Sequence, residues 1–424
     1  MKLNSLGILL FCLISQCVNA QLVTLQGIPR DTSFTPYSAW VGIKAKFPDA
    51  KIVIPQLPEG LTAENDVVYA TLPNTPFGKR DLHLDLFRPK KAGKYPALIL
   101  IHGGGWRSGN KRMQVLMAQD KTKITVAQDG SGDFTTIQAA IESCKSFPDE
   151  RITIFVKNGI YHEKVKVPSC NNRLSIIGES VEKTVISFGD FFNKINQGRN
   201  STFFTYTLLV EADDFSAENL TIENSAGPVG QAVALDVEGD RCVFRNCRIL
   251  GNQDTLYTAG QNSRQYFTNC YIEGTTDFIF GASTVLFDSC TVCSKSNSYV
   301  TAASTVKGRQ YGYVFLNCNL IAKEGINHAY LGRPWRDFAN VVFMKCDIGA
   351  HIVPEGWANW DKTTRDKTAY FAEYGNKGPG ANTTKRVAWS HQLTDKEAKK
   401  YTIENVLAPY LPNEPGVAVW TKGN

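Results

Sequence analysis

The pentapeptide VFRNC at 243–247 decides the fold, because related pentapeptides return four more times along the chain. Each copy carries an aromatic residue three positions before a cysteine: YFTNC ends at Cys270, LFDSC at Cys290, VFLNC at Cys318 and VFMKC at Cys346. Successive cysteines are 23, 20, 28 and 28 residues apart. Repeats of this length indicate a solenoid, in which each unit buries its apolar face by stacking on its neighbours.

The repeat units suit short strands better than helices. They show no helical periodicity, and a strand–helix–strand repeat needs about 30 residues or more. The leucine-rich pattern L-x-x-L-x-L is also absent. Three short strands joined by turns fill a coil of this length. We therefore predict an all-β chain that folds as a right-handed parallel β-helix.

The cysteines of the repeats are expected to stack as small apolar core residues. The chain has 11 cysteines, and two of them, Cys12 and Cys17, lie in the first 20 residues. The odd number that remains argues against a complete disulfide framework. CTVC at 290–293 stands alone, without the second half of a zinc site. The sequence therefore predicts no metal centre.

The first 20 residues have the pattern of a secretory signal peptide. They combine a basic Lys2, an apolar run over Leu6–Ile14 and a small Ala20 at the cleavage position. The apolar run is too short to span a membrane. We therefore expect a secreted protein, extracellular or periplasmic, that begins at Gln21. Cys17 leaves a lipoprotein anchor open as an alternative.

The segment 21–118 differs in character from the repeats. Strand-like runs such as KIVIP, DLHLDLFRP and YPALILI are separated by proline and glycine turns, and the last leads into IHGGGW at 101–106. This segment resembles the opening of an α/β-hydrolase carbohydrate esterase, where such a loop supplies oxyanion donors. The serine motif G-x-S-x-G is absent from the chain. We therefore predict a small, truncated α/β-hydrolase-like segment that is not catalytic.

The domain predicted for 119–424 begins with DKTKITVAQDGSGDFTTIQAAI at 120–141, which indicates a strand, a glycine turn and a helix over Thr135–Cys144. The chain of 424 residues has a net charge of +6, and its basic residues are scattered. No nucleic-acid motif is present, and no later segment is apolar enough to span a membrane. We expect a monomer with neither a nucleic-acid partner nor a membrane span.

Two aspartates follow the repeat at the same distance. Asp254 lies seven residues after Cys247, and Asp277 lies seven residues after Cys270. Equal phase in consecutive coils puts them side by side, because neighbouring strands are about 4.8 Å apart. Gln231, 23 residues before Asp254, is expected at the same phase one coil earlier.

Two carboxylates this close favour a division of acid and base roles. Both cannot ionise cheaply, so one is expected to stay ionised while its neighbour is more readily protonated. Aspartates that end strands and form Asx turns are the alternative interpretation. The amides of Gln231 and Gln253 near the pair favour a functional interpretation.

Seven further motifs follow one another along the repeat domain: DGSGDFTTIQAAI at 129–141, GIYHEKV at 159–165, QAVAL at 231–235, GNQDTLY at 251–257, DFIFG at 277–281, LGRPW at 331–335 and GWANWD at 356–361. In these motifs the chain resembles the pectin methylesterases (pectinesterases) over about 123–420. The resemblance implies a right-handed parallel β-helix, in agreement with the repeat. It also implies an enzyme that hydrolyses the C6 methyl esters of homogalacturonan to pectate and methanol, without metal or cofactor.

The resemblance implies catalytic roles for four residues. Asp277 in DFIFG matches the nucleophile, and Asp254 in QDTLY matches the general acid/base. Gln253 matches the donor to the oxyanion. Arg333 in LGRPW matches the residue that clamps the Asp277 carboxylate.

The resemblance also implies substrate contacts. Gln231 matches a residue that polarises or holds the substrate, Trp335 one that packs on a sugar ring, and Thr202 in STFF a further contact; Arg333 also counts among the binding residues. The other aromatic residues of the motifs either fill the core or line a sugar cleft: Tyr257, Phe278, Phe280, Trp357 and Trp360. Of these, the two tryptophans are favoured for the cleft.

Three other functions remain as alternatives. A pectin depolymerase shares the β-helix, but the motifs G-H-G and R-I-K of the hydrolases and the clustered aspartates of the calcium lyases are absent. A polysaccharide-binding solenoid would be expected to lack some of the catalytic residues. An acetyl esterase acting through 21–118 lacks its serine.

Overall fold

The computed structural model describes residues 22–25, 28–31, 61–75, 78–91, 93, 122–260, 262–412 and 414–421. The chain divides into two compact units, residues 1–120 and 121–424. The predicted signal peptide at 1–20 and the IHGGGW loop at 101–106 lie outside the described residues.

In the first unit, the described strands form two antiparallel pairs. Strand β1 (Leu22–Leu25) pairs with β2 (Ile28–Asp31), and β3 (Leu61–Thr75) pairs with β4 (Gly78–Pro89). The β3–β4 register shifts three times, which marks bulges in a long two-stranded ribbon. An α/β-hydrolase needs a largely parallel sheet covered by helices. The described residues of this unit therefore do not support the predicted α/β-hydrolase fragment.

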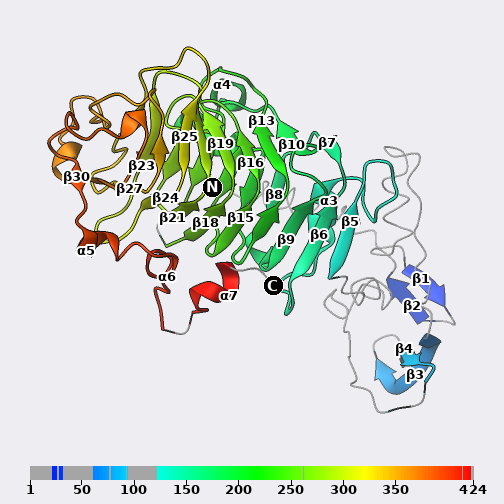
Figure 1. Ribbon diagram of the computed structural model, residues 1–424. Helices are drawn as coiled ribbons and strands as arrows, with labels where there is room; N and C mark the ends of the chain where they lie inside the picture. Colours follow the sequence, from blue (N-terminus) through cyan, green and yellow to red (C-terminus); the bar gives the residue numbers. More distant parts are fainter. Residues whose placement is uncertain are drawn as a thin grey trace, which may run out of the picture. The chain divides into compact units, whose positions relative to one another are not determined.

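The second unit is a parallel β-helix, in which three parallel sheets run along one axis (Figure 1). The first sheet has 11 strands: β5 (Lys123–Val126), β6 (Ile152–Val156), β9 (Leu174–Gly178), β12 (Ser216–Glu218), β15 (Cys242–Arg245), β18 (Arg264–Thr268), β21 (Thr284–Asp288), β24 (Tyr313–Leu316), β27 (Asn340–Met344), β29 (Tyr370–Tyr374) and β30 (His391–Gln392).

The other two sheets complete each coil. The eight-stranded sheet contains β7 (Gly159–Tyr161), β10 (Thr184–Phe188), β13 (Thr221–Asn224), β16 (Arg248–Leu250), β19 (Tyr271–Gly274), β22 (Thr291–Ser294), β25 (Asn319–Ala322) and β28 (Asp347–Ile348). The seven-stranded sheet contains β8 (Val165–Val167), β11 (Leu208–Val210), β14 (Leu235–Val237), β17 (Leu256–Thr258), β20 (Ile279–Gly281), β23 (Tyr299–Ala303) and β26 (Tyr330–Gly332). The all-β solenoid with three short strands per coil is thus confirmed.

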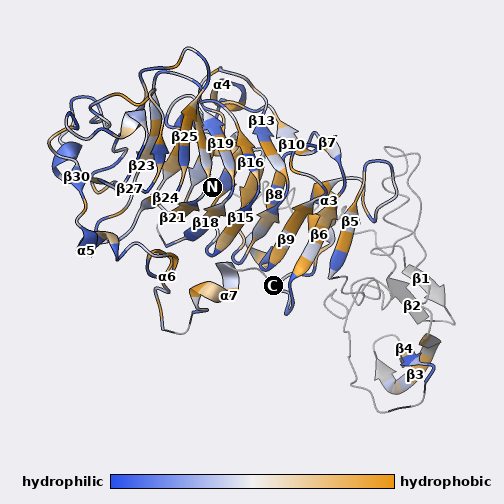
Figure 2. Ribbon diagram, in the orientation of Figure 1, coloured by the Kyte–Doolittle hydropathy of each residue, from blue (hydrophilic) through white to orange (hydrophobic). Residues whose placement is uncertain are grey.

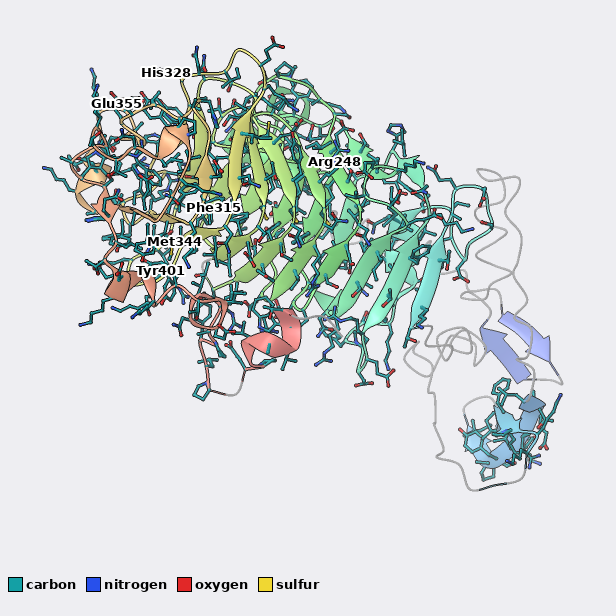
Figure 3. The ribbon with its side chains drawn as sticks, viewed as in Figure 1. Arg248, Phe315, His328, Met344, Glu355 and Tyr401 are labelled. Atoms are coloured by element: carbon teal, nitrogen blue, oxygen red, sulfur yellow. The ribbon has the colours of Figure 1, made fainter. Side chains whose placement is uncertain are left out.

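The pentapeptide repeat builds the core of the solenoid. Its phenylalanines pair in register from β15 to β27 and stack with ring centres 4.2 to 5.2 Å apart. Figure 2 shows hydrophobic residues concentrated on the strands, and Phe315 is one of the side chains inside the coil (Figure 3). The cysteines that follow are buried and free, as predicted: Cys247, Cys270, Cys290, Cys318 and Cys346.

The residue before each repeat cysteine turns the chain from the first sheet into the second. It has positive φ in all five copies: Asn246, Asn269, Ser289, Asn317 and Lys345. Asparagine tolerates this left-handed backbone better than most residues. The chain can therefore turn at the same point in coil after coil.

Helix α3 (Ile137–Ser143) packs against β5, β6 and β8 of the first coils. It begins after its cap Thr136 and buries Ile137, Ala140 and Ile141, in agreement with the helix predicted at Thr135–Cys144. The backbone N–H groups of Ile137 and Gln138 each donate to the Glu163 carboxylate at 2.9 Å. A carboxylate is favourable there because the N–H groups of a first helical turn lack partners.

The remaining helical segments are short. They are α4 (Phe192–Ile195), α5 (Asp395–Ala398), α6 (Ile403–Val406) and α7 (Val417–Thr421), with the 3₁₀ turns η3 (Ser169–Asn171), η4 (Gly198–Phe204), η5 (Arg365–Lys367) and η6 (Pro379–Ala381). The C-terminal residues Val406, Leu407, Val417 and Trp420 bury apolar surface on the outside of the 11-stranded sheet, against Val243, Tyr266, Leu286 and Val314.

Candidate active site

Asp254 and Asp277 occupy equivalent positions in neighbouring coils. Each lies just before a strand of the seven-stranded sheet, β17 and β20, and Leu256 pairs with Ile279 in register. Both have left-handed backbone, with φ of 64° and 51°. The N–H of each donates to a carbonyl of the following coil, Thr276 at 3.1 Å and Tyr299 at 2.8 Å. The parallel register therefore brings the two carboxylates together.

Arg333 binds the Asp277 carboxylate with a two-point fork. Its Nε donates to Oδ1 at 3.0 Å and its Nη2 donates to Oδ2 at 2.7 Å. Arg333 directly follows β26, and its backbone N–H donates to the carbonyl of Thr301 on β23 at 2.9 Å. The side chains are 16% and 8% exposed, so the pair is shielded but reachable from solvent. Such bidentate pairs orient a carboxylate as well as neutralise it.

The two carboxyl groups differ in their electrostatic surroundings. Burial, and then the negative charge of Asp277, raise the pKa of Asp254 to about 8, although a hydrogen bond from Gln231 and the charge of Arg333 oppose this. Burial also raises the pKa of Asp277, but the hydrogen bonds and charge of Arg333 oppose that shift directly. At neutral pH Asp254 therefore holds a proton, and Arg333 favours the ionised form of Asp277.

The predicted phase of Gln231 is wrong by one residue. Gln231 pairs with Gln253 in an isolated parallel bridge, rather than with Asp254. Farther along, Leu235 pairs with Leu256, so the register shifts by one residue between the two pairings. The left-handed turn at Asp254 lies within this stretch. Gln231 still reaches the Asp254 carboxyl group through its side chain.

Aromatic side chains lie outside the coil beside the carboxylates. Tyr257 and Phe280 are paired in register on β17 and β20, and their rings stack with centres 4.7 Å apart. Phe203 packs on Tyr257 at 4.9 Å, and Trp335 meets Phe280 edge-on at 5.8 Å. We call these four residues the aromatic floor. The floor is separate from the main core; Phe280 is buried, but Phe203, Tyr257 and Trp335 are partly exposed and can offer ring faces to a ligand.

Three other residues singled out in the sequence are buried. Trp357, expected in a cleft, is 1% exposed and packs between Phe343 and Phe371 in the core, where its Nε1 donates to Glu373. Phe278 is fully buried in the same core. Thr202 is 5% exposed in η4.

Hydrogen bonds to the backbone carbonyl of Thr202 hold this residue in its turn. Its carbonyl accepts hydrogen bonds from the N–H and the Oγ1 of Thr205, at 3.1 and 2.6 Å. Thr205 Oγ1 in turn accepts the N–H of Val233 at 2.9 Å. Thr202 thus fixes the 3₁₀ turn that carries Phe203, a member of the aromatic floor. Phe203 was not predicted from the sequence as a site residue, because it does not belong to any repeat.

Tyr299 was also missed, although the sequence contains a signal for it. It lies 22 residues after Asp277, close to the 23-residue step that separates Asp254 from Asp277. The next coil therefore places it beside Asp277, whose N–H donates to its carbonyl.

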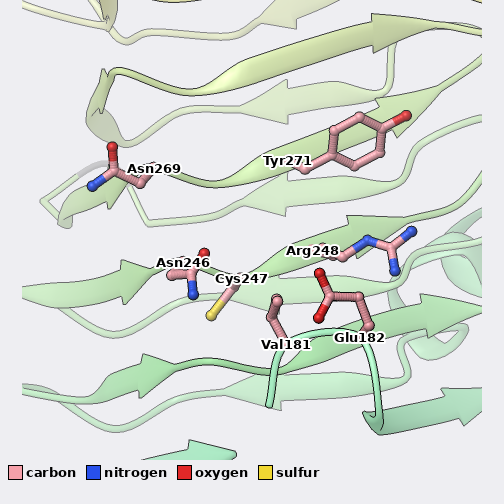
Figure 4. A pocket seen from close by; sticks show the side chains of 7 residues that line it. All are labelled: Val181, Glu182, Asn246, Cys247, Arg248, Asn269 and Tyr271. Carbon is pink, nitrogen blue, oxygen red and sulfur yellow. The ribbon is translucent and has the colours of Figure 1, made fainter.

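Within the described residues, no group of three or more histidine, cysteine, aspartate or glutamate side chains could hold a metal ion. None of the described helices has the length and apolarity needed to cross a membrane. A groove of about 270 Å³ lies elsewhere, on the eight-stranded sheet, between Val181, Glu182, Arg248 and Tyr271 (Figure 4). It contains a single carboxylate, Glu182. We place the chemistry at the Asp254–Asp277 pair instead, because two coupled carboxylates and a guanidinium converge there.

Comparison with known proteins shows the family of the chain. A family model described as Pectinesterase matches residues 123–409. The chain belongs to the pectinesterase family. It is accordingly an enzyme, a carboxylic ester hydrolase of the pectin methylesterase class.

Relatives of known sequence align with the β-helix unit. Pectinesterase 31 of Arabidopsis thaliana is 41% identical over 294 residues, which are 68% of this chain and 92% of that protein. Pectinesterase 5 of Arabidopsis thaliana is 40% identical over 307 residues, 69% of this chain and 51% of that protein.

Solved pectin methylesterases share the fold. The enzyme from carrot has a TM-score of 0.64 and 32% identity, over 69% of this chain and 97% of its own. A pectin methylesterase crystallised in complex with a hexasaccharide has a TM-score of 0.60 and 30% identity, over 69% of this chain and 98% of its own.

Proposed function

We propose that this enzyme hydrolyses C6 methyl esters of homogalacturonan, with Asp277 as nucleophile and Asp254 as general acid and base. The observation that carries the proposal is the asymmetric pair: Asp277 is held by a guanidinium fork, while its neighbour Asp254 has a pKa of about 8. A nucleophile must be ionised and an acid must be protonated at the same pH, and the surroundings of the two groups favour this combination.

In the first step, an Asp277 carboxylate oxygen attacks the ester carbonyl carbon. The amides of Gln253 and Gln231 donate hydrogen bonds to the developing oxyanion, a role worth on the order of 3 kcal/mol for one donor. Asp254 gives its proton to the methoxy oxygen as the bond to the carbonyl carbon breaks. The products are methanol and a mixed anhydride between Asp277 and the galacturonate.

In the second step, Asp254 acts as a base. Now ionised, it takes a proton from a water molecule, and the resulting hydroxide attacks the galacturonate carbonyl of the anhydride. The bond to Asp277 breaks, which releases the free acid of the product and restores the carboxylate. Asp254 is protonated again, so one water is consumed for each methanol released.

The substrate is proposed to lie over the aromatic floor. A sugar ring has an apolar face that packs on an aromatic ring, and Trp335 is partly exposed beside Phe280. In this proposal, Gln231 and Arg333 also contact the substrate, while Thr202 acts through its turn rather than by direct contact. The relative in complex with a hexasaccharide supports an oligosaccharide ligand.

We propose further that residues 119–424 carry this activity as a monomer without metal or cofactor, and that 21–118 is not catalytic. The signal-peptide pattern at 1–20 supports action outside the cytoplasm, where a cell-wall polysaccharide is met.

The test is a set of three assays on one purified sample. Methanol release is measured on methyl-esterified pectin, new reducing ends on polygalacturonate, and acetate release on acetylated xylan. Methanol alone is the expected result. Chain cleavage would instead assign a depolymerase, acetate release would assign an acetyl esterase, and absence of all three products would leave a binding solenoid.

A further inference from the structure

Two aromatic rings flank the guanidinium of Arg333. Its central carbon is 4.1 Å from the ring centre of Tyr299 and 4.0 Å from that of Trp360. The stack continues beyond both rings. Tyr299 stacks on Tyr330 with centres 5.4 Å apart, and the guanidinium of Arg365 lies 5.6 Å from the ring centre of Trp360. A continuous stack of aromatic and arginine side chains therefore lies beside the Asp277 carboxylate.

The two flanking rings come from independently fixed segments. Tyr299 starts β23, and its carbonyl accepts the Asp277 N–H at 2.8 Å, so its backbone is tied to the nucleophile. Trp360 lies in the loop between β28 and η5, where its backbone N–H donates to Asn359 Oδ1 at 2.8 Å. Asn359 Nδ2 donates in turn to the Thr363 carbonyl and to Asp366. Neither ring depends on the Asp277–Arg333 contact for its position.

The edge and the faces of the Arg333 guanidinium therefore serve different partners. Nε and Nη2 on its edge hold Asp277, while its central carbon lies over the rings of Tyr299 and Trp360. A guanidinium is weakly hydrated and stacks well on aromatic faces, and this attraction grows where water is excluded. Since the fork works only when the guanidinium and carboxylate are nearly coplanar, the rings limit the rotation that would break it.

We propose that Tyr299 and Trp360 are positioning residues, which fix the plane of Arg333 so that its fork keeps Asp277 ionised and correctly oriented. This inference rests on the proposed function, in which Asp277 is the nucleophile. The charged groups that face this assembly are Asp254 beside Asp277, Asp361 near Arg333, and Arg365 over the Trp360 ring. With a ring removed, Arg333 is expected to leave the carboxylate plane for part of the time, and Asp277 to ionise only at higher pH.

The test compares ring removal with ring retention in the full chain. Trp360→Leu and Tyr299→Leu should each lower kcat for methanol release about tenfold, the effect expected from losing one buried cation–π contact. The acidic limb of the kcat/KM profile should move to higher pH, while KM changes little. Tyr299→Phe keeps the ring and should match the wild type in both respects. Trp335→Leu, on the aromatic floor, should instead raise KM and leave the acidic limb in place.

A titration that needs no turnover separates this inference from the proposed function. The carboxyl carbon-13 signal of Asp277, assigned by its absence in Asp277→Asn, should titrate at higher pH in both leucine variants and at the wild-type pH in Tyr299→Phe. An unchanged midpoint, or a change in KM alone, would overturn the positioning role. A wild type that releases no methanol would defeat the proposed function, but the titration would still decide the role of the rings. If the leucine variants unfold on heating well below the wild type, Asn359→Ser, which loosens only the Trp360 loop, should show the same shift at smaller size.

Discussion

Two aspartates of the solenoid share one local structure but differ in their surroundings. Asp214 and Asp277 both have left-handed backbone, with φ of 56° and 51°, and each is gripped by an arginine fork. Arg241 Nε and Nη2 donate to Asp214 at 2.7 and 3.0 Å, much as Arg333 donates to Asp277. The Asp214 side chain is 16% exposed, so it is no less accessible than Asp277.

The neighbours of the two pairs differ in kind. Arg241 also binds Asp240, at 2.6 Å, and the carbonyl of Asp214 accepts a hydrogen bond from Arg151 at 2.8 Å. These groups form an ion-pair network that ties coils together. Asp277 faces instead a carboxyl group with a pKa of about 8, and its arginine is covered by rings. An arginine fork alone can therefore be purely structural, and we propose that the protonated Asp254 is what suits the Asp277–Arg333 pair to catalysis.

The largest expected difference between the two pairs is in turnover. Asp277→Asn should lower kcat for methanol release on the order of 10⁴-fold or more, because an amide cannot form the anhydride. Asp214→Asn should leave kcat near the wild-type value and lower only the thermal stability. Initial rates at a temperature where both variants are folded provide the comparison, and an active, folded Asp277→Asn protein would contradict the mechanism.

Asp254→Asn should reduce kcat by about 10² to 10⁴-fold, the usual contribution of a positioned acid or base. Asparagine keeps the volume but neither gives nor takes the proton. A burst of methanol followed by slow turnover would show that the second step suffers more than the first. Equal activity of this variant and the wild type would remove Asp254 from the mechanism.

The two arginines should respond differently to lysine. Arg333→Lys keeps the charge but loses the planar fork, so we expect a fall in kcat of about 10 to 100-fold, since one charge-assisted hydrogen bond is worth about 1.5–3 kcal/mol. Arg241→Lys should reduce the free energy of unfolding by a similar amount without altering kcat. Kinetics and urea unfolding of both variants test this, and a change confined to KM in Arg333→Lys would place Arg333 on the substrate instead.

The pKa of Asp254 predicts how rate and stability depend on pH. Deprotonation removes the acid of the first step, so kcat/KM should fall above about pH 8. Because the folded-state pKa exceeds the ordinary value of 3.8, the folded state binds more protons than the unfolded state between these values. The free energy of unfolding contains the whole of this contribution below about pH 4. As the pH rises to about 8 the contribution is lost, at no more than about 1.4 kcal/mol per pH unit. Denaturation of Asp254→Asn across the same range should show a flatter profile.

The smallest expected effect concerns the first unit. Deleting 21–118 should change methanol release by less than about twofold, because all of the proposed site residues lie in the second unit, residues 121–424. Activity of the deleted chain on pectin, compared with the full chain, tests this. Complete loss of activity with the β-helix still folded would show that the first unit supports the site.

The sequence is enough to predict the solenoid and the proximity of the two carboxylates. The pentapeptide repeat places its phenylalanines and cysteines in the core, and the equal seven-residue offsets place Asp254 and Asp277 in adjacent coils. Both inferences need only the fact that parallel strands stack in register. The phase of Gln231 was wrong because the segment from Gln231 to Leu235 is one residue longer than its partner segment from Gln253 to Leu256, and counting along the chain does not reveal this.

The aromatic residues were harder to place from the sequence. Trp357 and Trp360 lie three residues apart in one motif, yet Trp357 is buried between Phe343 and Phe371 and Trp360 covers Arg333. The loop that carries them has no strand periodicity to show which side faces inward. The substrate contact of Thr202 stays a prediction, and the structure adds that its carbonyl accepts hydrogen bonds within a 3₁₀ turn.

The sequence by itself determined the coil, its core and the pairing of Asp254 with Asp277, because the side chains of a parallel β-helix repeat with the strands. Only the tertiary structure brought Arg333, 56 residues away, onto Asp277 and enclosed its guanidinium between Tyr299 and Trp360. Only the tertiary structure also decided which carboxyl group keeps its proton. That choice depends on burial and on the distance to a guanidinium, and both arise when separate coils and loops pack together.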